Sequence, residues 1–357
     1  MIEQESELAG NHTWSFHPND VPKTAKSWLS PLIAHQWEGY QVRFPKFSRH
    51  LHLTYACCTS ERFRKVVGSH FLNSSSVLLT STKVDSISDT NAVVKNGNVY
   101  HGAVVVDCRG PSSIGATDVG MGYQKFVGLE IELEQDWPDS QPTIMDGCTD
   151  QIDGFRFVYT LPFSKRRVLV EDTCFSDRSE INRTEHIDRI KSYVGDRVAG
   201  SWRVLREESG CLPMPFSAAF LPRATRPLSG GYAGGWFHAA TGYSFPMSIR
   251  FAEAVAKVSP ENAWHAVEEL AIRHRKRAIF SRFLNGLLFR LVRPDTRWQI
   301  FRRFYRVLSE DAIARFYSHE FTSMDATRIV VGKPPAGLTP WRFLRTRKAM
   351  VCPSTVL

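Results

Sequence analysis

Two adjacent acidic residues follow an apolar run in the middle of the chain. Glu171 and Asp172 stand in the stretch RRVLVEDT, and Phe155, Phe157 and Tyr159 stand in a preceding stretch that alternates in the manner of a strand. Adjacent residues of a strand point to opposite faces, so one of the two carboxyls should face the buried side of a sheet. Among aromatic side chains its pKa would rise, and it could hold a proton near neutral pH. Such a group is a general acid suited to an apolar substrate.

Structural ion pairs are the alternative for the same two acids. Arg156, Arg166 and Arg167 are the candidate partners, and paired carboxyls also have shifted pKa values without taking part in chemistry. A second acidic pair, Glu207 and Glu208, presents the same two possibilities in a less apolar stretch. The residues alone leave this choice open.

Two glycine-bearing stretches could lie against a nucleotide. The apolar segment VVVDCRG contains Asp107 and ends in Gly110, where the backbone could approach a ligand. The stretch HAATGYSFP precedes a predicted helix, so Thr241, Gly242 and Tyr243 would direct backbone N–H groups and the positive helix end at an anion or an electron-rich ring. A glycine turn with a threonine cap explains this second stretch equally well.

The first three residues are typical of the end of a strand in a dinucleotide-binding unit. Met1 and Ile2 are apolar, Glu3 follows them, and a polar turn leads to Gly10. In such a unit the acid at the end of the second strand holds a ribose hydroxyl. The G-x-G-x-x-G turn that comes before this strand is not found in the chain.

Several familiar chemistries have no counterpart in the sequence. The seven cysteines form no CxxC pair, and no HxxxH or HExxH pattern occurs. His12, His17, His35 and His238 are isolated by spacing, and no serine stands in a GxSxG pattern. The sequence therefore predicts no metal site, no hydrolase nucleophile, and the reduced cysteines of an intracellular protein without a structural disulfide.

The charge balance favours an anionic partner. The 357 residues carry a formal net charge of +9, and residues 273–315 hold twelve Lys or Arg against three Asp or Glu, interleaved with Phe, Leu and Trp298. This pattern is typical of an interfacial helix on an anionic membrane, and a solvated helix face is the alternative. No motif supports a nucleic acid partner. No apolar run is long enough for a membrane span, and the polar start is no signal peptide.

The pattern of elements indicates an α/β chain (α+β overall), and the aromatic content of 12% suits a large apolar ligand as well as a core. We expect a helix capped by Ser60, a strand at 77–87, a hairpin at Asn96-Gly97, a buried strand from Ala103 to Val106, an antiparallel sheet within 123–175, a helical segment at 180–207, a strand, glycine loop and helix over 228–258, and helices from 261 to 320.

Five stretches, in order along the chain, resemble bacterial lycopene β-cyclases. They are GNHTWSFH (10–17), YQVRFP (40–45), RFVYTLP (156–162), LVEDT (169–173) and HAATGYSFP (238–246), and the resemblance reaches VVGKPP (330–335). It implies a glutathione-reductase-like FAD-binding fold with an antiparallel-sheet substrate domain and a C-terminal helical region. The implied domains are an FAD-binding domain at 1–20, 55–122 and 226–260, the substrate domain at 123–225, membrane-facing helices at 261–335 and a basic tail at 336–357.

The same resemblance implies the reaction. Enzymes of this family close the linear ends of lycopene into the β-rings of β-carotene without net oxidation, require reduced FAD, and take electrons from a nicotinamide cofactor. Glu171 matches the essential acid of the family, with Asp172 beside it, and Glu3 matches the ribose acid. The segments that contact FAD in the family contain Arg62, Asp107, Gly110, Gly242 and Tyr243.

The family begins with a strand, the G-x-G-x-x-G turn and a helix, so we expect roughly 30 residues of one βαβ unit to be missing before Met1. An inactive truncated remnant is one alternative. A flavin-dependent hydroxylase of the same fold, with a polar ring site and consumption of oxygen, is another. The resemblance implies a cytoplasmic protein, peripheral on the inner membrane, with lycopene or a related linear carotene as substrate.

Overall fold

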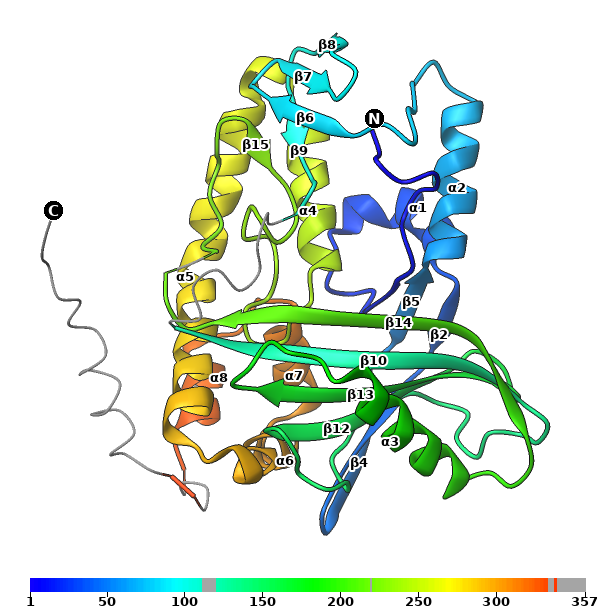
Figure 1. Ribbon diagram of the computed structural model, residues 1–357. Coiled ribbons are helices and arrows are strands. Elements are labelled where there is room, and N and C mark those ends of the chain that lie inside the picture. Colours follow the sequence, from blue (N-terminus) through cyan, green and yellow to red (C-terminus); the bar gives the residue numbers. More distant parts are fainter. Residues whose placement is uncertain (111–119, 219, 333–336, 339–357) are drawn as a thin grey trace, which may run out of the picture.

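The computed structural model describes residues 1–110, 120–218, 220–332, 337 and 338. Long strands cross the lower half of the molecule, α1, α2 and α4 stand above them, and the helices α6, α7 and α8 lie at one end (Figure 1). The strands are β1 (Thr13–Phe16), β2 (His35–Trp37), β3 (Tyr40–Phe44), β4 (Phe47–Leu51), β5 (Tyr55–Thr59), β6 (Val84–Ile87), β7 (Asn91–Val94), β8 (Val99–His101), β9 (Val106–Asp107), β10 (Met121–Leu133), β11 (Thr143–Asp146), β12 (Phe155–Pro162), β13 (Arg167–Ser176), β14 (Trp202–Pro215) and β15 (Leu228–Ser229).

The α-helices gather mainly in the second half of the chain. They are α1 (Lys26–Leu29), α2 (Ser60–Leu72), α3 (Arg183–Gly195), α4 (Phe245–Ala256), α5 (Ala263–Leu291), α6 (Trp298–Val307), α7 (Glu310–Tyr317) and α8 (Ser323–Val330).

A seven-stranded sheet in the order β14-β10-β13-β12-β11-β3-β4 forms the centre of the molecule. All of its pairs are antiparallel except β11 with β3. The antiparallel sheet expected within 123–175 is therefore present. Because side chains alternate along each strand, the sheet has two apolar faces with different coverings.

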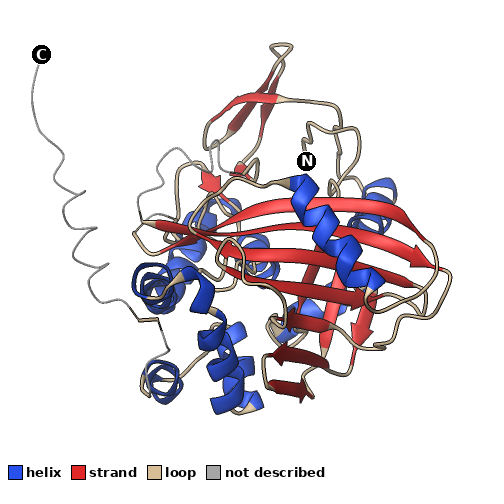
Figure 2. Ribbon diagram, turned by 60° about the horizontal axis from the view of Figure 1, so that its bottom comes forward, coloured by secondary structure: helices blue, strands red, loops and turns tan. Residues whose placement is uncertain are grey.

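The outer face of the sheet is covered by α3, which lies across the strands (Figure 2). Val158, Val170 and Leu129, from three neighbouring strands, pack with Ile190 and Val194 of α3. On the inner face, Phe157, Leu169 and Phe175 belong to a second core that includes residues of the C-terminal helices. In β12 and β13, the odd-numbered apolar residues belong to the inner core and the even-numbered ones belong to the outer core.

Helix α5 approaches β10 closely at a glycine. A Cβ built on Gly122 would overlap the ring of Phe289, which is buried on α5. The absence of a side chain at Gly122 therefore allows this helix to lie against the sheet.

Two parallel pairings of the kind found in nucleotide-binding domains join the N-terminal part of the chain to itself and to residues 228–229. Ile2 pairs with Leu79 in parallel, and β9 pairs with β15 in parallel. Two small antiparallel sheets, β1-β5-β2 and β6-β7-β8, lie in the same part of the chain.

The hairpin at Asn96-Gly97 is confirmed, because β7 and β8 pair on either side of it. The helices from residue 261 onward, and the strand, loop and helix over 228–258, are also confirmed. The domain boundaries stay predictions. The basic tail predicted at 336–357 lies outside the described residues, apart from 337 and 338.

Four local predictions are wrong. Thr59, and not Ser60, caps α2, because its side chain accepts a hydrogen bond from the Arg62 amide. In 77–87 only Val84–Ile87 is a strand, and Ser81 has a positive φ of 51° that interrupts extended chain. The buried strand expected from Ala103 to Val106 is the half-buried pair Val106–Asp107.

The helix expected over 180–207 ends at residue 195, and β14 begins at Trp202. Asp196 is the C-cap of the helix, and Gly200, at a φ of +95°, lies in the segment that leads to β14, where it is incompatible with a continuing helix. β14 is an edge strand of the sheet, and polar side chains of its charged first half face solvent. Its sequence therefore lacks the apolar alternation of a buried strand.

Candidate active site

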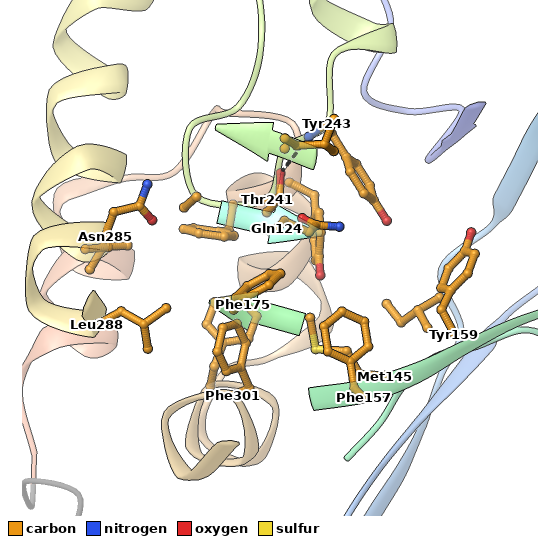
Figure 3. Close-up of a pocket in the computed structure, with 18 of the residues that line it drawn as sticks. Gln124, Met145, Phe157, Tyr159, Phe175, Thr241, Tyr243, Asn285, Leu288 and Phe301 are labelled. Atoms are coloured by element: carbon orange, nitrogen blue, oxygen red, sulfur yellow. Dashed lines mark hydrogen bonds between the residues drawn. The ribbon is translucent and has the colours of Figure 1, made fainter. Parts of the chain in front are cut away.

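One cavity of about 840 Å³ opens between the inner face of the sheet, the C-terminal helices and the Thr241–Tyr243 loop. Figure 3 shows Phe157, Phe175 and Phe301 gathered on one side of it and Thr241 and Tyr243 on the other. The ring centroids of Phe175 and Phe301 are 5.2 Å apart in an edge-on arrangement. The cavity therefore has an aromatic end and a more polar end.

Glu171 lines this cavity from β13. Burial is the main cause that raises its pKa to about 8, and the Glu208 carboxylate adds to the rise. The hydroxyl of Thr173 donates a hydrogen bond to Glu171 Oε1 at 2.7 Å and opposes that rise. Glu171 is therefore a carboxyl that can hold a proton at neutral pH on the wall of a largely apolar cavity.

Asp172 points to the other face of the sheet and is absent from the cavity wall. Its side chain is fully buried beneath α3, where Oδ1 lies 2.5 Å from Arg156 Nε and Oδ2 lies 2.7 Å from His186 Nδ1. Arg189 is a further partner at 3.6 Å. The ion-pair alternative that the sequence left open therefore describes Asp172, and its assignment as a catalytic residue finds no support in this geometry.

The polar end of the cavity is formed by glycine-bearing turns from three segments. Gly110, Gly231 and Gly242 all line it, and each has a positive φ. No described atom lies within 4 Å of a Cβ built on Gly110 or Gly231. Open space beside two glycines lets a flat ligand approach the backbone at these points.

Helix α4 begins at this polar end. Its N-cap is Ser244, whose side chain makes no capping hydrogen bond, whereas Thr241 Oγ1 accepts a hydrogen bond from the Tyr243 amide at 3.4 Å. Thr241 therefore forms the turn rather than the helix cap. No side chain caps the start of α4 and its first turn carries no acidic residue, so the positive end of this helix is suited to an electron-rich ligand.

A group of tyrosine hydroxyls connects the two ends of the cavity. The hydroxyl of Tyr55 lies 2.6 Å from that of Tyr243 and 3.2 Å from that of Tyr159, and Tyr159 donates to Ser15 Oγ at 2.7 Å. Burial raises the pKa of all three tyrosines, so they are neutral hydrogen-bonding groups near pH 7.

Besides Asp172, four of the predicted site residues do not line the cavity. Phe155 is fully buried behind Phe157, with ring centroids 5.1 Å apart. The Arg62 guanidinium donates to the Pro31 carbonyl at 2.6 Å. The remaining two belong to the nucleotide prediction: Glu3 accepts a hydrogen bond from the Glu5 amide at 3.1 Å, and Asp107 is paired with Arg109 at 2.9 Å.

Two histidine-containing clusters are not evident from sequence spacing. His238, His274 and His319 come together, with ring centroids 4.5 Å apart for His238 and His319 and 6.0 Å apart for His274 and His319. Burial lowers the pKa of His238 to about 4 and that of His274 to about 3, so these rings are neutral at pH 7. The isolation expected for His238 is therefore wrong.

The second cluster joins Asp172, Cys174 and His186, whose potential ligand atoms lie within 4.8 Å of one another. Arg156 and Arg189 already pair with Asp172. Because these arginines neutralise the carboxylate, the cluster provides an ion-pair network rather than a site for a cation.

Sequence reasoning missed several residues of the cavity wall. Phe175, Phe301 and Tyr55 line it from β13, α6 and β5, and Glu208 lines it from β14. Glu208 stands in the second acidic pair of the sequence, but only strand pairing places it near Glu171. For the aromatic residues the sequence has no signal, because they come from segments far apart in the chain.

Comparison with known proteins agrees with this geometry. A family model described as lycopene cyclase protein matches residues 1–342. A lycopene β-cyclase from Pantoea ananas is 37% identical over 94% of this chain and 87% of that protein, and one from Pseudescherichia vulneris is 34% identical over 96% and 89%.

Solved structures show the same fold at low identity. A geranylgeranyl bacteriochlorophyll reductase-like protein from Thermoplasma acidophilum has a TM-score of 0.59 and 13% identity, with 98% of this chain and 92% of that chain covered. A probable FAD-dependent monooxygenase from Pseudomonas aeruginosa has a TM-score of 0.56 and 13% identity, with 84% and 90% covered. With the family model matched from residue 1 to 342, the chain belongs to the lycopene cyclase family.

Proposed function

We propose that this chain is a lycopene β-cyclase, which closes the linear ends of lycopene into β-rings, by way of γ-carotene to β-carotene, without net oxidation. The observation that carries the proposal is the position of Glu171, a carboxyl whose pKa burial raises to about 8 on the wall of an aromatic cavity. Similarity to two lycopene β-cyclases over almost the whole chain supports the choice of substrate.

The reaction begins with transfer of a proton from Glu171 to C2 of the terminal C1=C2 double bond. The transfer leaves a tertiary cation at C1, which the C5=C6 double bond attacks. The C1–C6 bond forms, and the positive charge moves to C5. Loss of the proton from C6 then re-forms the C5=C6 double bond. Glu171, left as a carboxylate by the first step, takes up this proton, so the acid is restored and no electrons are gained or lost.

Aromatic side chains stabilise the cations and exclude water. Phe157, Tyr159 and Phe175 line the same cavity as Glu171, and Tyr159 is the residue of β12 that pairs with Glu171. One ring face contributes about 2 kcal/mol to a cation in a dry site. Exclusion of water by the same rings prevents hydration of the cation, which would give an alcohol instead of a ring.

FAD fits the polar end of the cavity. The open space beside Gly110 and Gly231 and the uncapped start of α4 are suited to a flat, electron-rich ring. The backbone of Thr241, Gly242 and Tyr243 would hold it there, and the fold shared with a probable FAD-dependent monooxygenase supports this cofactor. When bound in its reduced form, the flavin supplies negative charge that stabilises the cations, and NAD(P)H supplies the electrons that keep it reduced.

The contacts of the nucleotide part of FAD stay predictions. Glu3 is proposed for a ribose hydroxyl, and Arg62 and Asp107 for the neighbouring part of the cofactor. The single parallel bridge between Ile2 and Leu79, directly before Glu3, supports this placement, because the ribose acid of a dinucleotide-binding unit follows parallel-paired chain.

We further propose that substrate enters from an anionic membrane surface, at the cytoplasmic face of the inner membrane, on which the protein is peripheral. In the described part of the chain, no helix has both the length and the apolar character needed to cross a bilayer. Helix α5 instead exposes a stripe of Ile272, Lys276, Ile279 and Phe283, in which Phe283 is 50% exposed. The next residues of this helix, from Leu284 to Leu291, contribute four leucines to the cavity wall, so the stripe adjoins the aromatic site.

The proposal is tested by expressing the chain in bacteria that accumulate lycopene and separating their pigments by chromatography. The parent protein should convert lycopene to γ- and β-carotene, and the Glu171→Gln variant should leave lycopene unchanged. A flavin hydroxylase would instead form oxygenated pigments and consume oxygen in proportion. Cyclisation by Glu171→Gln at the parent rate would exclude Glu171 as the acid.

A further inference from the structure

A second carboxyl of the cavity lies in the same row of the sheet as Glu171. In the register of the sheet, Gly128 of β10 pairs with Glu171 of β13 on one side and with Glu208 of β14 on the other. Their side chains share the inner face, and both line the cavity. A Cβ built on Gly128 would lie 3.2 Å from Glu208 Cγ and 3.5 Å from Glu171 Cγ. The glycine therefore leaves the two acid side chains facing each other over a bare strand.

The two carboxyls have different hydrogen-bonding partners. Glu208 Oε2 accepts hydrogen bonds from Arg206 Nη1 at 2.5 Å and from Thr13 Oγ1 at 3.1 Å. Glu171 receives one from the Thr173 hydroxyl. Burial raises the pKa of Glu208, and the Arg206 guanidinium and the Thr13 hydroxyl oppose that rise by stabilising its negative charge. Glu171 has no cationic partner among the described residues.

We propose that Glu208 is a positioning residue for the proton of Glu171: its charge, held by Arg206 and Thr13, keeps the facing carboxyl protonated. This inference rests on the proposed function, in which Glu171 is the acid. Two neighbouring carboxyls with unequal partners divide the roles, so that one carries the charge and the other carries the proton.

Other polar groups around Glu171 do not replace Glu208 in this role. Asp172 raises the pKa of Glu171 more weakly, because it points away beneath the sheet. Tyr159 faces Glu171 from β12 and is neutral. Two groups from neighbouring strands act on Glu208, namely Thr13 of β1 and Glu130 of β10. Glu130 also accepts a hydrogen bond from Arg206, and His12, which precedes β1, lies near the same guanidinium.

The test compares Glu208→Gln with two matched variants. Glu208→Asp keeps the charge, and Glu207→Gln neutralises the adjacent acid, which points to the opposite face and pairs with Arg183 outside the cavity. The readout is kcat/KM for lycopene in phosphatidylcholine vesicles, with flavin-loaded enzyme, as a function of pH. In the parent enzyme this parameter should fall as pH rises through the Glu171 pKa, about 8.

Glu208→Gln should move that alkaline limb to lower pH by about one unit, equivalent to a tenfold change in the ionisation constant of Glu171. Glu208→Asp should restore most of the parent profile, and Glu207→Gln should match it. An alkaline limb at the parent position in a folded Glu208→Gln protein overturns the proposal.

A second variant tests the proposal if Glu208→Gln does not fold. Thr13→Val keeps the shape of a strand residue and removes one donor to Glu208, so it should move the limb in the same direction by a smaller amount. If Glu208→Gln is unfolded and Thr13→Val is folded, a Thr13→Val protein whose kcat/KM falls at the same pH as in the parent also counts against the proposal.

A stability measurement separates this proposal from the cyclase assignment. The difference in melting temperature between Glu171→Gln and the parent, followed from pH 5 to 9, reports the titration of Glu171 without any turnover. The difference in melting temperature between the double variant Glu171→Gln/Glu208→Gln and the single variant Glu208→Gln should change at lower pH than this difference does. If it does so while Glu171→Gln still cyclises lycopene, the pairing holds and the catalytic role of Glu171 fails.

Discussion

Glu171 and Asp172 are joined by one peptide bond, yet their carboxyl groups lie on opposite faces of the sheet. Glu171 lines the cavity, whereas Asp172 is fully buried beneath α3 between Arg156 and His186. Strand alternation imposes this separation, because successive side chains point to opposite faces. The two acids should therefore respond differently when each is neutralised.

Glu171→Gln should lower kcat for lycopene cyclisation by at least about a hundredfold, because removal of a general acid typically has this effect. The protein should stay folded and keep its flavin, since Glu171 lies on a cavity wall. Asp172→Asn should instead reduce the yield of folded protein and leave kcat per folded molecule within about a few-fold of the parent. Pigment turnover normalised to flavin absorbance distinguishes these results. Equal losses of kcat in both variants would contradict the separation.

The pH dependence of stability should reveal the proton on Glu171. Burial raises the pKa of Glu171 in the folded protein to about 8 from the ordinary value of 4.5. The folded state therefore binds a proton that the unfolded chain has released. This contribution to stability is fully present below about pH 4.5 and is lost as pH rises to about 8. Relative to Glu171→Gln, the melting temperature of the parent should fall across this window, and parallel curves would exclude the raised pKa.

The pair of Arg156 with Asp172 should be important for folding. Both side chains are buried, with 7% and 0% exposure. Arg156→Met leaves the buried Asp172 carboxylate with His186 and the more distant Arg189 as partners. The loss in the free energy of unfolding should therefore approach the value of about 3–5 kcal/mol that follows removal of one partner of a buried pair. Urea denaturation measures this change.

The matched control for Arg156→Met is Arg166→Met, which removes an exposed pair with Asp136 on the neighbouring turn. An exposed pair contributes less than about 1 kcal/mol. Similar losses of stability in the two variants would show that the burial of Asp172 has no special energetic consequence.

Binding to anionic vesicles should depend on the exposed stripe of α5. The double variant Arg273→Gln/Lys276→Gln removes two exposed cations beside Ile279 and Phe283. Each cation near an anionic surface contributes about 1 kcal/mol, so binding should weaken by roughly tenfold or more at low salt. Sedimentation with vesicles that contain phosphatidylglycerol measures the binding.

The control for this prediction is Lys26→Gln/Lys65→Gln, which removes two exposed lysines from other helices. The control should bind as the parent does. Equal weakening in both double variants would mean that net charge alone, and not the α5 stripe, determines membrane association.

The sequence by itself determined the family and the local elements with strong signals. The hairpin at Asn96-Gly97 and the helical segment after residue 261 followed from turn chemistry and apolar periodicity, which depend on near neighbours alone. Glu171 also emerged from the sequence as the leading candidate, because it matches the essential acid of the family that the stretch LVEDT resembles.

Only the tertiary structure decided what surrounds Glu171. The pairing of Gly128 with both Glu171 and Glu208 depends on the register of three strands, and Phe301 reaches the same cavity from a helix about 130 residues along the chain. The meeting of His238 with His319 has the same origin. A pKa depends on the charges and solvent within a few ångströms, and these are set by long-range packing rather than by sequence neighbours. The division of roles between two adjacent acids was therefore open until the sheet assigned each one a face.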